Sequence, residues 1–483
     1  MRTKAIYILL TVLLAAACLC IMALPSARPQ KATADAPSPS PTTAPQAAPT
    51  APDAFTVRSD GSIEGDFVSH LPLLCIENGG AEIAYGEPGW CDIRVIDNAN
   101  GQNRPDEEGV FTTPSTIWVR GQSSSLFDKK SYGMEFFKKT GGKNQRDIEV
   151  LGMAAGHDWV LHGPYLDKAL VRNRLSYSIA RQTMFWAPDT RYCEVFLNGA
   201  YQGVYLIVEA PRVDENRIAL ADYALLTGET PYLLQRNRPD TDTTILKCFG
   251  TFAGKTYYPL YVRYPVDDRL TARQLDWITR DVSAFERALY ADWYLDEARG
   301  YKNYIDMDSF VTYFVLMEFS MNKDNGFLST YCCKDIGGKL MMGPVWDYNN
   351  GYDNYNGFPT YPDERGDGFV IADNNWYARM STDRAFVDAA VEKYRTLRQS
   401  VLSTDAIMRY LDETDAYLGP AVARNFARWP QSLNWHYLGK DDDGNHRDLN
   451  SYAEAQQAIR TFIRLRGAYL DKNITLLYNN CVN

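Results

Sequence analysis

Residues 322–347 read NKDNGFLSTYCCKDIGGKLMMGPVWD, and their pattern decides how the second half of the chain folds. Two strand-like runs, FLSTYCCK and KLMMGPVW, flank the turn-forming residues DIGG, which predicts a β-hairpin. Asp324 precedes the first run and Asp347 follows the second. A hairpin loop of two to four residues puts Asp324 opposite a residue between 349 and 351. The spacing therefore predicts that both carboxylates lie at the same open end of one hairpin.

Two carboxylates at the end of a hairpin allow three interpretations. Diagonal neighbours across a hairpin lie about 7–8 Å apart, a span that one metal ion or one phosphoryl group bridges. With asparagines nearby, they suit a hard cation such as Mg²⁺ or Ca²⁺. They also suit the acid and base of a glycosidase. The plainest alternative is a hairpin whose acidic residues only hydrogen-bond to the loop backbone.

The 483 residues have a globular composition, with 45% hydrophobic, 23% charged and 13% aromatic residues. This length allows one large domain or two or three ordinary ones. A net charge of −10 argues against a nucleic-acid-binding protein, which needs a basic surface. The sequence has no GxSxG, HExxH or Walker motif, and His157 and His162 are too isolated to indicate zinc.

The N-terminal residues indicate export. Arg2 and Lys4 precede an uncharged apolar run, so residues 1–24 are typical of a signal peptide or an uncleaved signal anchor. Residues 25–54 are rich in Pro, Ala, Thr and Ser, and we expect them to form a disordered linker. The seven cysteines outside the apolar run are an odd number without a CxxC pair, so no disulfide framework is predicted. We expect an exported protein at the cell surface, either membrane-anchored or secreted.

The folded part, from about residue 55, changes from strands to helices. RYCEVFLNGAYQGVYLIVE predicts a hairpin with Asn198 and Gly199 at its turn. TARQLDWITRDVSAFERALYA predicts an amphipathic helix capped by Thr271. DMDSFVTYFVLMEFSMN is apolar nearly all round and predicts a buried helix. Strands first and helices later favour an α+β fold with two lobes.

A second polar stretch, IWVRGQSSSLFDKKSYGMEF, joins Arg120, a Gly/Ser loop that includes Ser123 and Ser124, and the pair Lys129 and Lys130. Backbone N–H groups of such a loop, with a lysine on the next strand, make a phosphate cradle. Solvated lysines are the alternative. Because neighbouring residues of a strand point to opposite faces, only one of the two lysines faces such a site.

Five stretches, taken in order, resemble the spore coat H (CotH) family of atypical protein kinases: RGQSSSLFDKKSYGMEF, DWVLHGPYLDKALVRNRLSYSIAR, EVFLNGAYQGVYLIVE, SFVTYFVLMEFSMNKDN and GGKLMMGPVWDYNNGY. The resemblance extends from about residue 71 to residue 470. It implies a kinase-like fold with a strand-rich lobe over residues 55–265 and a mainly helical lobe over residues 266–483. It also implies ATP, a divalent metal (Mg²⁺ or Mn²⁺) and phosphoryl transfer to protein hydroxyls.

The resemblance also implies roles for the hairpin residues. Asp324 corresponds to the catalytic-loop aspartate, which orients the acceptor hydroxyl, and Asp347 corresponds to the metal-binding aspartate. Kinase-like catalytic loops place an asparagine about five residues after the catalytic aspartate as a second metal ligand. Ser329 stands there in this sequence. This difference leaves three alternatives. Asn349 serves as the second metal ligand in place of the missing asparagine, only one metal ion binds, or catalysis is impaired.

The remaining implied contacts are to the nucleotide. Lys130 or its neighbour Lys129 neutralises phosphate charge, and Arg120 supports the Gly/Ser loop. Glu209, at the end of a strand, contacts the nucleotide.

Together these interpretations predict an exported CotH-like kinase that acts on Ser/Thr hydroxyls of surface or coat proteins. Because ATP is scarce outside cells, the alternative is a surface binding or assembly module that keeps the fold without turnover. We expect no nucleic-acid partner and no membrane contact beyond the N-terminal anchor.

Overall fold

The computed structural model describes residues 53–224, 227–238, 243–255, 258–324, 326–355, 368–370, 375–434, 438 and 447–482. The expected export segment and nearly all of the expected linker lie outside these residues. Within the described part of the chain, no helix is both long enough and apolar enough to span a bilayer. The described residues belong to one compact unit.

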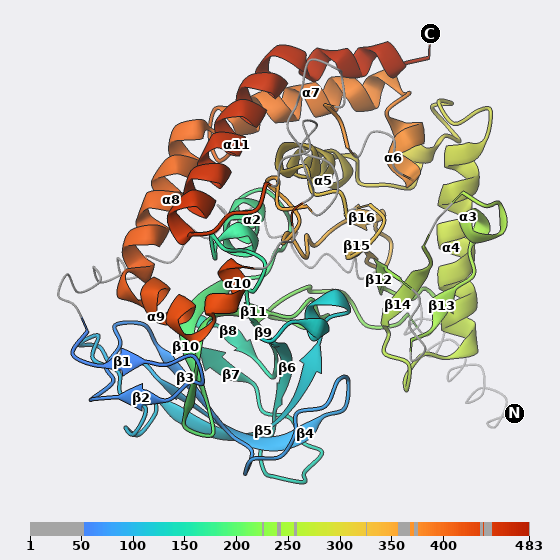
Figure 1. The fold of residues 1–483 in the computed structure, drawn as a ribbon. Coiled ribbons are helices and arrows are strands. Elements are labelled where there is room, and N and C mark those ends of the chain that lie inside the picture. The colour runs from blue at the N-terminus through green and yellow to red at the C-terminus, as the bar shows by residue number, and fades with distance from the viewer. Residues whose placement is uncertain are drawn as a thin grey trace, which may run out of the picture. The chain divides into compact units, whose positions relative to one another are not determined.

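A closed barrel forms most of the first half of the described chain (Figure 1). Its strands follow the order β10-β11-β9-β6-β5-β4-β3, and β3 closes it by pairing in parallel with β10. Their bounds are Leu73–Glu77 (β3), Gly89–Ile96 (β4), Phe111–Arg120 (β5), Ser131–Phe136 (β6), Asp158–His162 (β9), Thr190–Leu197 (β10) and Ala200–Glu209 (β11). Alternate residues of these strands, such as Ile117, Val119, Met134 and Leu161, are buried in one apolar core.

Two short strand pairs accompany the barrel. They are β1 (Thr56–Val57) with β2 (Ile63–Glu64), and β7 (Ile148–Val150) with β8 (Met153–Gly156).

The hairpin of β10 and β11 confirms the prediction made from its turn residues. Asn198 and Gly199 connect the strands, with φ angles of 47° and 79°. Positive φ at both central residues is what a two-residue hairpin turn of type I′ requires, and Asn-Gly adopts it with little strain.

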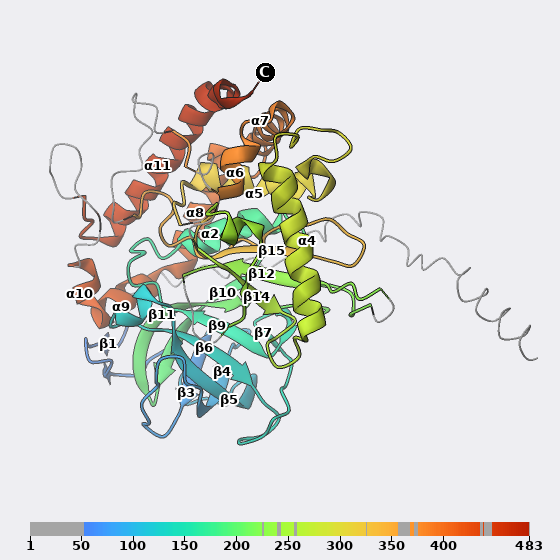
Figure 2. The ribbon, with the colours of Figure 1, turned by 90° about the vertical axis from the view of Figure 1, so that its right-hand side faces the viewer.

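A second sheet has the order β13-β14-β12-β15-β16, and Figure 2 shows helix α4 running along it. Its strands are Tyr232–Arg236 (β12), Ile245–Leu246 (β13), Leu260–Tyr264 (β14), Thr330–Lys334 (β15) and Met341–Met342 (β16). Because β12 pairs with both β14 and β15, this sheet takes strands from both sides of the lobe boundary expected at residue 265. The two halves of the chain are therefore joined by main-chain hydrogen bonds.

Helices dominate the second half of the described chain, which gives the expected α+β class. The α-helices of the described residues are Arg172–Arg181 (α2), which lies between β9 and β10, and Phe249–Phe252 (α3), Ala272–Tyr290 (α4), Met307–Ser320 (α5), Asn375–Met380 (α6), Arg384–Arg398 (α7), Thr404–Leu418 (α8), Pro420–Arg428 (α9), Pro430–Leu433 (α10) and Tyr452–Asn473 (α11). Short 3-10 helices span Ser123–Leu126 (η1), Tyr301–Asn303 (η2) and Ile474–Asn480 (η3).

Two helices confirm specific predictions. Thr271 caps α4 in a capping box, since its hydroxyl accepts from the Gln274 N–H while the Gln274 side chain accepts from the Thr271 N–H. Helix α5 is buried on all sides from Ser309 to Ser320, as its nearly continuous apolar sequence predicts.

Helix α9 is attached to the barrel through buried charges. Arg424 donates to both carboxylate oxygens of Glu194, at 2.8 and 2.7 Å, and Glu194 is fully buried. The Asn425 side-chain oxygen accepts from Lys129 Nζ at 2.7 Å and from the Val204 N–H at 3.1 Å. Because unpaired buried charges are strongly unfavourable, these contacts fix α9 against the barrel wall.

Candidate active site

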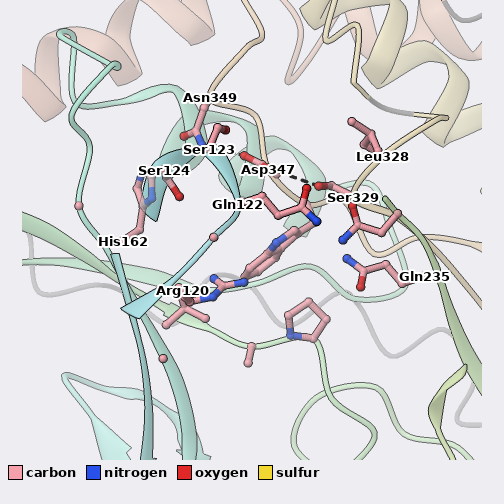
Figure 3. Close-up of a pocket in the computed structure, with 18 of the residues that line it drawn as sticks. Arg120, Gln122, Ser123, Ser124, His162, Gln235, Leu328, Ser329, Asp347 and Asn349 are labelled. Atoms are coloured by element: carbon pink, nitrogen blue, oxygen red, sulfur yellow. Dashed lines mark hydrogen bonds between the residues drawn. The ribbon is translucent and has the colours of Figure 1, made fainter. Parts of the chain in front are cut away.

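A cavity of about 830 Å³ lies between the barrel, the second sheet and the segments after α5 and β16 (Figure 3). Strands β5, β6 and β9 and the loop after β5 supply the barrel side, and β12 and β14 supply the opposite side. The lining includes Arg120, Gln122, Ser123, Ser124, His162, Gln235, Asp324, Ser329, Asp347 and Asn349. Most of these side chains are polar, so the cavity suits a charged ligand.

The two aspartates of the hairpin both line this cavity. Strands β15 and β16 pair antiparallel, with Cys332 opposite Met342. That register, extended beyond the strands, places Asp324 opposite Asn350, inside the predicted interval. The Asn350 side-chain amide does donate to the Asp324 carboxylate. The prediction that one hairpin brings the two carboxylates to one end is confirmed.

Asn322, which is 1% exposed, ties the two aspartate segments together. Its amide nitrogen donates to the Asp347 carbonyl at 2.8 Å, and its amide oxygen accepts from the Asp324 N–H at 3.4 Å. One buried side chain therefore sets the spacing of the two acidic segments.

Asp347 adopts an unusual backbone conformation, with φ of 61°. Non-glycine residues hold the left-handed conformation only where the surroundings fix it, and such residues concentrate at functional sites. Its carboxylate accepts from Ser329 Oγ at 3.3 Å (Figure 3) and from Asn349 Nδ2 at 2.7 Å. The carboxylate is thus oriented by two neutral donors and directed into the cavity.

Helix α2 provides the contacts that fix the Asp347 loop. The Tyr177 hydroxyl accepts from the Asp347 N–H at 3.1 Å, and Asn173 Oδ1 accepts from the Tyr348 N–H at 2.7 Å. The buried Arg172 donates to the carbonyl of Gly351 at 3.1 Å and pairs with the buried Asp167 at 2.5 Å. These three side chains satisfy loop backbone groups that would otherwise be buried without partners.

Helix α2 makes one further hydrogen bond, to the side chain of Asn349. Asn173 Nδ2 donates to Asn349 Oδ1 at 3.0 Å, so the amide proposed as a metal ligand is itself oriented by the helix.

The electrostatics of the site favour proton or cation binding. Burial, together with the negative charge of Asp324, raises the pKa of Asp347 to about 6, against the lowering effects of Arg120, Ser329 and Asn349. Burial also raises the pKa of Asp324, although the hydrogen bond from Asn350 and the charge of Arg238 oppose it. Two carboxylates that repel each other in a partly dry cavity are stabilised by any cation between them.

Arg120 and the Gly/Ser loop lie on the barrel side of the cavity, as the sequence predicts. Arg120 ends β5, and its guanidinium lies over the Trp346 ring at 5.5 Å. The loop continues through Gly121, where φ is 91° and a Cβ atom would lie 2.0 Å from Ser124 Oγ. Glycine is therefore required for the sharp turn that directs Ser123 and Ser124 into the cavity.

Neither predicted lysine lines the cavity. Lys129 is 1% exposed and is directed toward α9, where its Nζ contacts Asn425 and the Val204 carbonyl. Lys130 Nζ donates to the Ser125 carbonyl at 2.8 Å and so supports the Gly/Ser loop from outside. Both residues precede β6, so the strand alternation used to choose between them does not extend to them.

Glu209 is also absent from the lining. It is 2% exposed, and its carboxylate accepts from the Asp189 N–H at 2.8 Å. Its contacts are structural.

Several lining residues were not predicted, because they come from the second sheet. Gln235 belongs to β12, Arg263 belongs to β14, and Arg238 follows β12. Arg263 Nε donates to Gln235 Oε1 at 2.8 Å. The long-range pairing of β12 with β15 brings these residues to the aspartates, and a single sequence carries no local signal of that pairing.

The donor set around Asp347 fits a hard divalent cation. The carboxylates of Asp324 and Asp347 and the Ser329 hydroxyl offer oxygen atoms, which Mg²⁺ and Mn²⁺ prefer. The Asn349 amide turns its nitrogen toward Asp347 and its oxygen toward Asn173, so it must flip to become a ligand. Burial and the charge of Asp324 raise the pKa of Asp347 although Arg120 opposes them, so further positive charge would stabilise the ionised carboxylate. Asp347 is the residue best placed to hold the metal, with Asn349 beside it.

Comparison with known proteins now identifies the family. Residues 117–470, well over half of the chain, match the family described as CotH kinase protein. The chain belongs to this family. The CotH match covers the Gly/Ser loop, helix α2 and both aspartates, so the resemblance read from the sequence is confirmed.

A CotH relative matches a shorter part of the chain. The inner spore coat protein H of Bacillus subtilis (strain 168) is 32% identical over 112 residues. The match covers 23% of this chain and 27% of that protein, so the chain spans about a quarter of the relative's length.

The first prediction concerns the support that α2 gives to the CotH site. Arg172→Met leaves the buried Asp167 carboxylate unpaired and removes the donor to the Gly351 carbonyl. We expect the free energy of unfolding to fall by about 3–5 kcal/mol, as for other broken buried pairs. Urea denaturation measures it. Arg280→Met, which removes an exposed pair with Asp276, is the matched control and should change stability by less than about 1 kcal/mol.

Restoring the charge balance tests the cause. The double variant Arg172→Met/Asp167→Asn should recover part of the lost stability. A double variant that is less stable than Arg172→Met would contradict the buried-pair explanation.

The second prediction concerns the charge of Asp347. Its pKa is raised from 3.8 to about 6, so the folded protein binds this proton more tightly than the unfolded chain does between these pH values. Stability therefore falls as the pH rises through this window and stays lower above it. Asp347→Asn should raise Tm in metal-free buffer at pH 7.5. At about 1.4 kcal/mol per pH unit, the gain is at most about 3 kcal/mol.

Scanning calorimetry at several pH values provides the measurement. The gain should shrink toward pH 4, where Asp347 of the parent is already neutral. Asp92→Asn, an exposed aspartate of β4, serves as the control and should leave Tm unchanged. A variant that is less stable than the parent at every pH would refute the prediction.

Proposed function

We propose that this CotH protein is an atypical kinase that binds ATP with Mg²⁺ or Mn²⁺ in the cavity. It would transfer the γ-phosphoryl group to Ser or Thr hydroxyls of surface or coat proteins. The observation that carries this proposal is the convergence of Asp324, Asp347 and Arg120 with a Gly/Ser loop on one polar cavity. Phosphoryl transfer needs little covalent help from a protein, and it depends on positioning and charge stabilisation of this kind.

Each residue has a proposed role in the reaction. Asp324 accepts the proton of the acceptor hydroxyl as its oxygen bonds to the γ-phosphorus and the bond to the leaving ADP oxygen breaks. Burial raises the pKa of Asp324, which makes its carboxylate a stronger base. Arg120 and the backbone N–H groups near Ser123 and Ser124 contact the phosphates. Asp347 and Asn349 hold the metal.

A bound divalent metal would supply positive charge against the phosphate oxygens. The protein would contribute by orienting the Asp347 carboxylate through hydrogen bonds from Ser329 and Asn349.

The fold and the relative support the wider proposal. The barrel on one side of the cavity and the second sheet with its helices on the other correspond in our interpretation to the two lobes of a kinase. The N-terminal sequence supports export, and the name of the Bacillus relative, a spore coat protein, supports association with a coat.

A second candidate is a binding or assembly module with the same fold and no turnover. Two observations favour it. No lysine is among the described residues that line the cavity, whereas kinases use one on the phosphates. Ser329 also stands where a catalytic loop carries a metal-binding asparagine. A transfer assay with labelled ATP and metal separates the two candidates.

The third prediction distinguishes the two aspartates. Asp347→Asn removes a negative charge from the metal site, so the metal–nucleotide complex should bind poorly. Asp324→Asn should leave nucleotide affinity nearly unchanged and lower turnover by about 10²–10⁴-fold, as expected for loss of a general base. Calorimetric titration with Mg²⁺ and a non-hydrolysable ATP analogue, beside the transfer assay, measures both effects.

The outcomes separate the candidates. If the parent binds the nucleotide but transfers nothing, the binding module is correct. If neither the parent nor the variants bind it, the cavity has another ligand.

The fourth prediction is that Arg120, and not Lys129 or Lys130, contacts the phosphates of the nucleotide. Charged hydrogen bonds are worth about 1.5–3 kcal/mol, so Arg120→Met should weaken binding of the ATP analogue about 10- to 100-fold. Lys130→Met should have a smaller effect, because Lys130 supports the loop only through the Ser125 carbonyl. Arg280→Met on the surface of α4 is the control. A larger loss for Lys130→Met than for Arg120→Met would restore the lysine cradle.

A further inference from the structure

A second cluster of ligand-type side chains lies on the barrel. Glu135 of β6 is opposite Asp158 of β9 in the antiparallel register, and His157 immediately precedes Asp158. Each residue offers one ligand atom, and these atoms all lie within 4.8 Å of one another. His157 is isolated in the sequence, but the pairing of β6 with β9 brings it to two carboxylates.

The histidine of this cluster is oriented by a carboxylate outside it. His157 Nδ1 lies 2.6 Å from Asp147 Oδ1, and a carboxylate oxygen only accepts, so Nδ1 carries the proton. His157 Nε2 is buried and has no hydrogen-bond partner among the described residues. It lies 3.2 Å from Asp158 Oδ1. With Nδ1 protonated in the neutral ring, a nitrogen lone pair faces a carboxylate oxygen, and this contact is repulsive unless a proton or a metal cation lies between the two atoms.

The two carboxylates are oriented in the same way. Arg212 holds the other oxygen of Asp158, and the Gln145 amide donates to Glu135 Oε1. Each member of the cluster therefore has one atom fixed by an outer partner and one atom left for a ligand. Outer partners of this kind, above all a carboxylate on the second histidine nitrogen, are typical of metal sites in proteins.

We infer that Glu135, His157 and Asp158 form a binding site for a divalent transition metal, with Zn²⁺ as the best fit. An imidazole nitrogen with two carboxylates suits zinc, whereas Mg²⁺ and Ca²⁺ prefer oxygen ligands alone. At tetrahedral angles, metal–ligand distances of about 2.0–2.2 Å place ligand atoms about 3.3–3.6 Å apart, so the outermost atoms, up to 4.8 Å apart here, must close by about 1 Å. Glu135 is partly exposed, so its side chain has room for this movement.

The site is distinct from the aspartate pair. Glu135 and Asp158 line the barrel side of the same cavity, but their hydrogen bonds and ion pairs within the described part of the chain go to other residues than Asp324 and Asp347. The inference therefore does not depend on the proposed kinase activity. A bound zinc ion would neutralise the two carboxylates and present open coordination positions to the cavity.

Zinc titration of the full chain by calorimetry tests the inference. The parent should bind one Zn²⁺ that His157→Gln does not bind. Asp147→Asn should weaken this binding about 10- to 100-fold, the usual effect of losing an outer partner. Glu149→Gln, an exposed carboxylate on β7, is the matched control and should bind like the parent. Asp347→Asn should retain the zinc.

Two further measurements make the result decisive. X-ray absorption should show one nitrogen-bearing ring and oxygen ligands at the zinc ion. Far-UV circular dichroism should show that each variant folds. If His157→Gln does not fold, Asp147→Asn carries the test, because the Asp147 side chain is 63% exposed. Equal zinc affinity in the parent, His157→Gln and Asp147→Asn would overturn the inference and leave a protonated histidine between carboxylates.

Discussion

The position of Asp347 depends on hydrogen bonds that one short helix makes to the backbone of one loop. Arg172 and Asn173 lie in the first turn of α2 and Tyr177 in the second, and they contact loop groups from Asp347 to Gly351. The loop has no regular secondary structure of its own, so side chains must satisfy its polar groups. Because most of α2 is buried in the larger apolar core, the cavity keeps its geometry only while that packing is intact.

This support stabilises an arrangement that is unfavourable in isolation. Asp347 has a left-handed backbone and a raised pKa, and Asp324 repels it. Strain and like charge at one place are typical of a site built for a ligand, since a fold selected only for stability would neutralise them. The buried Arg172–Asp167 pair next to the loop shows that the surrounding fold can place charge in balance where no ligand is needed.

Local features of the sequence predicted local features of the structure. The capping box at Thr271, the Asn-Gly turn and the aspartate hairpin follow from residues that are near one another in the chain, and all three are confirmed. Lys129 shows the limit of such reasoning. Its burial is decided by Asn425, which is 296 residues away, and no pattern around Lys129 reveals that partner.

The same limit explains the parts of the site that were missed. The pairing of β12 with β14 and β15 brings Gln235 and Arg263 to the aspartates. The pairing of β6 with β9 forms the Glu135–His157–Asp158 cluster. In both cases the paired strands are separated by many residues in the sequence. Periodicity predicts that a strand exists and which residues alternate along it, but it does not specify the partner strand.

The attachment of α9 to the barrel also has a consequence for the order of folding during synthesis. Lys129 lies just before β6 and Glu194 lies in β10, but their partners Asn425 and Arg424 come 296 and 230 residues later in the chain. A nascent chain that ends before α9 would have to bury these two charges without their α9 partners, so the barrel cannot reach its final packing until most of the chain has emerged.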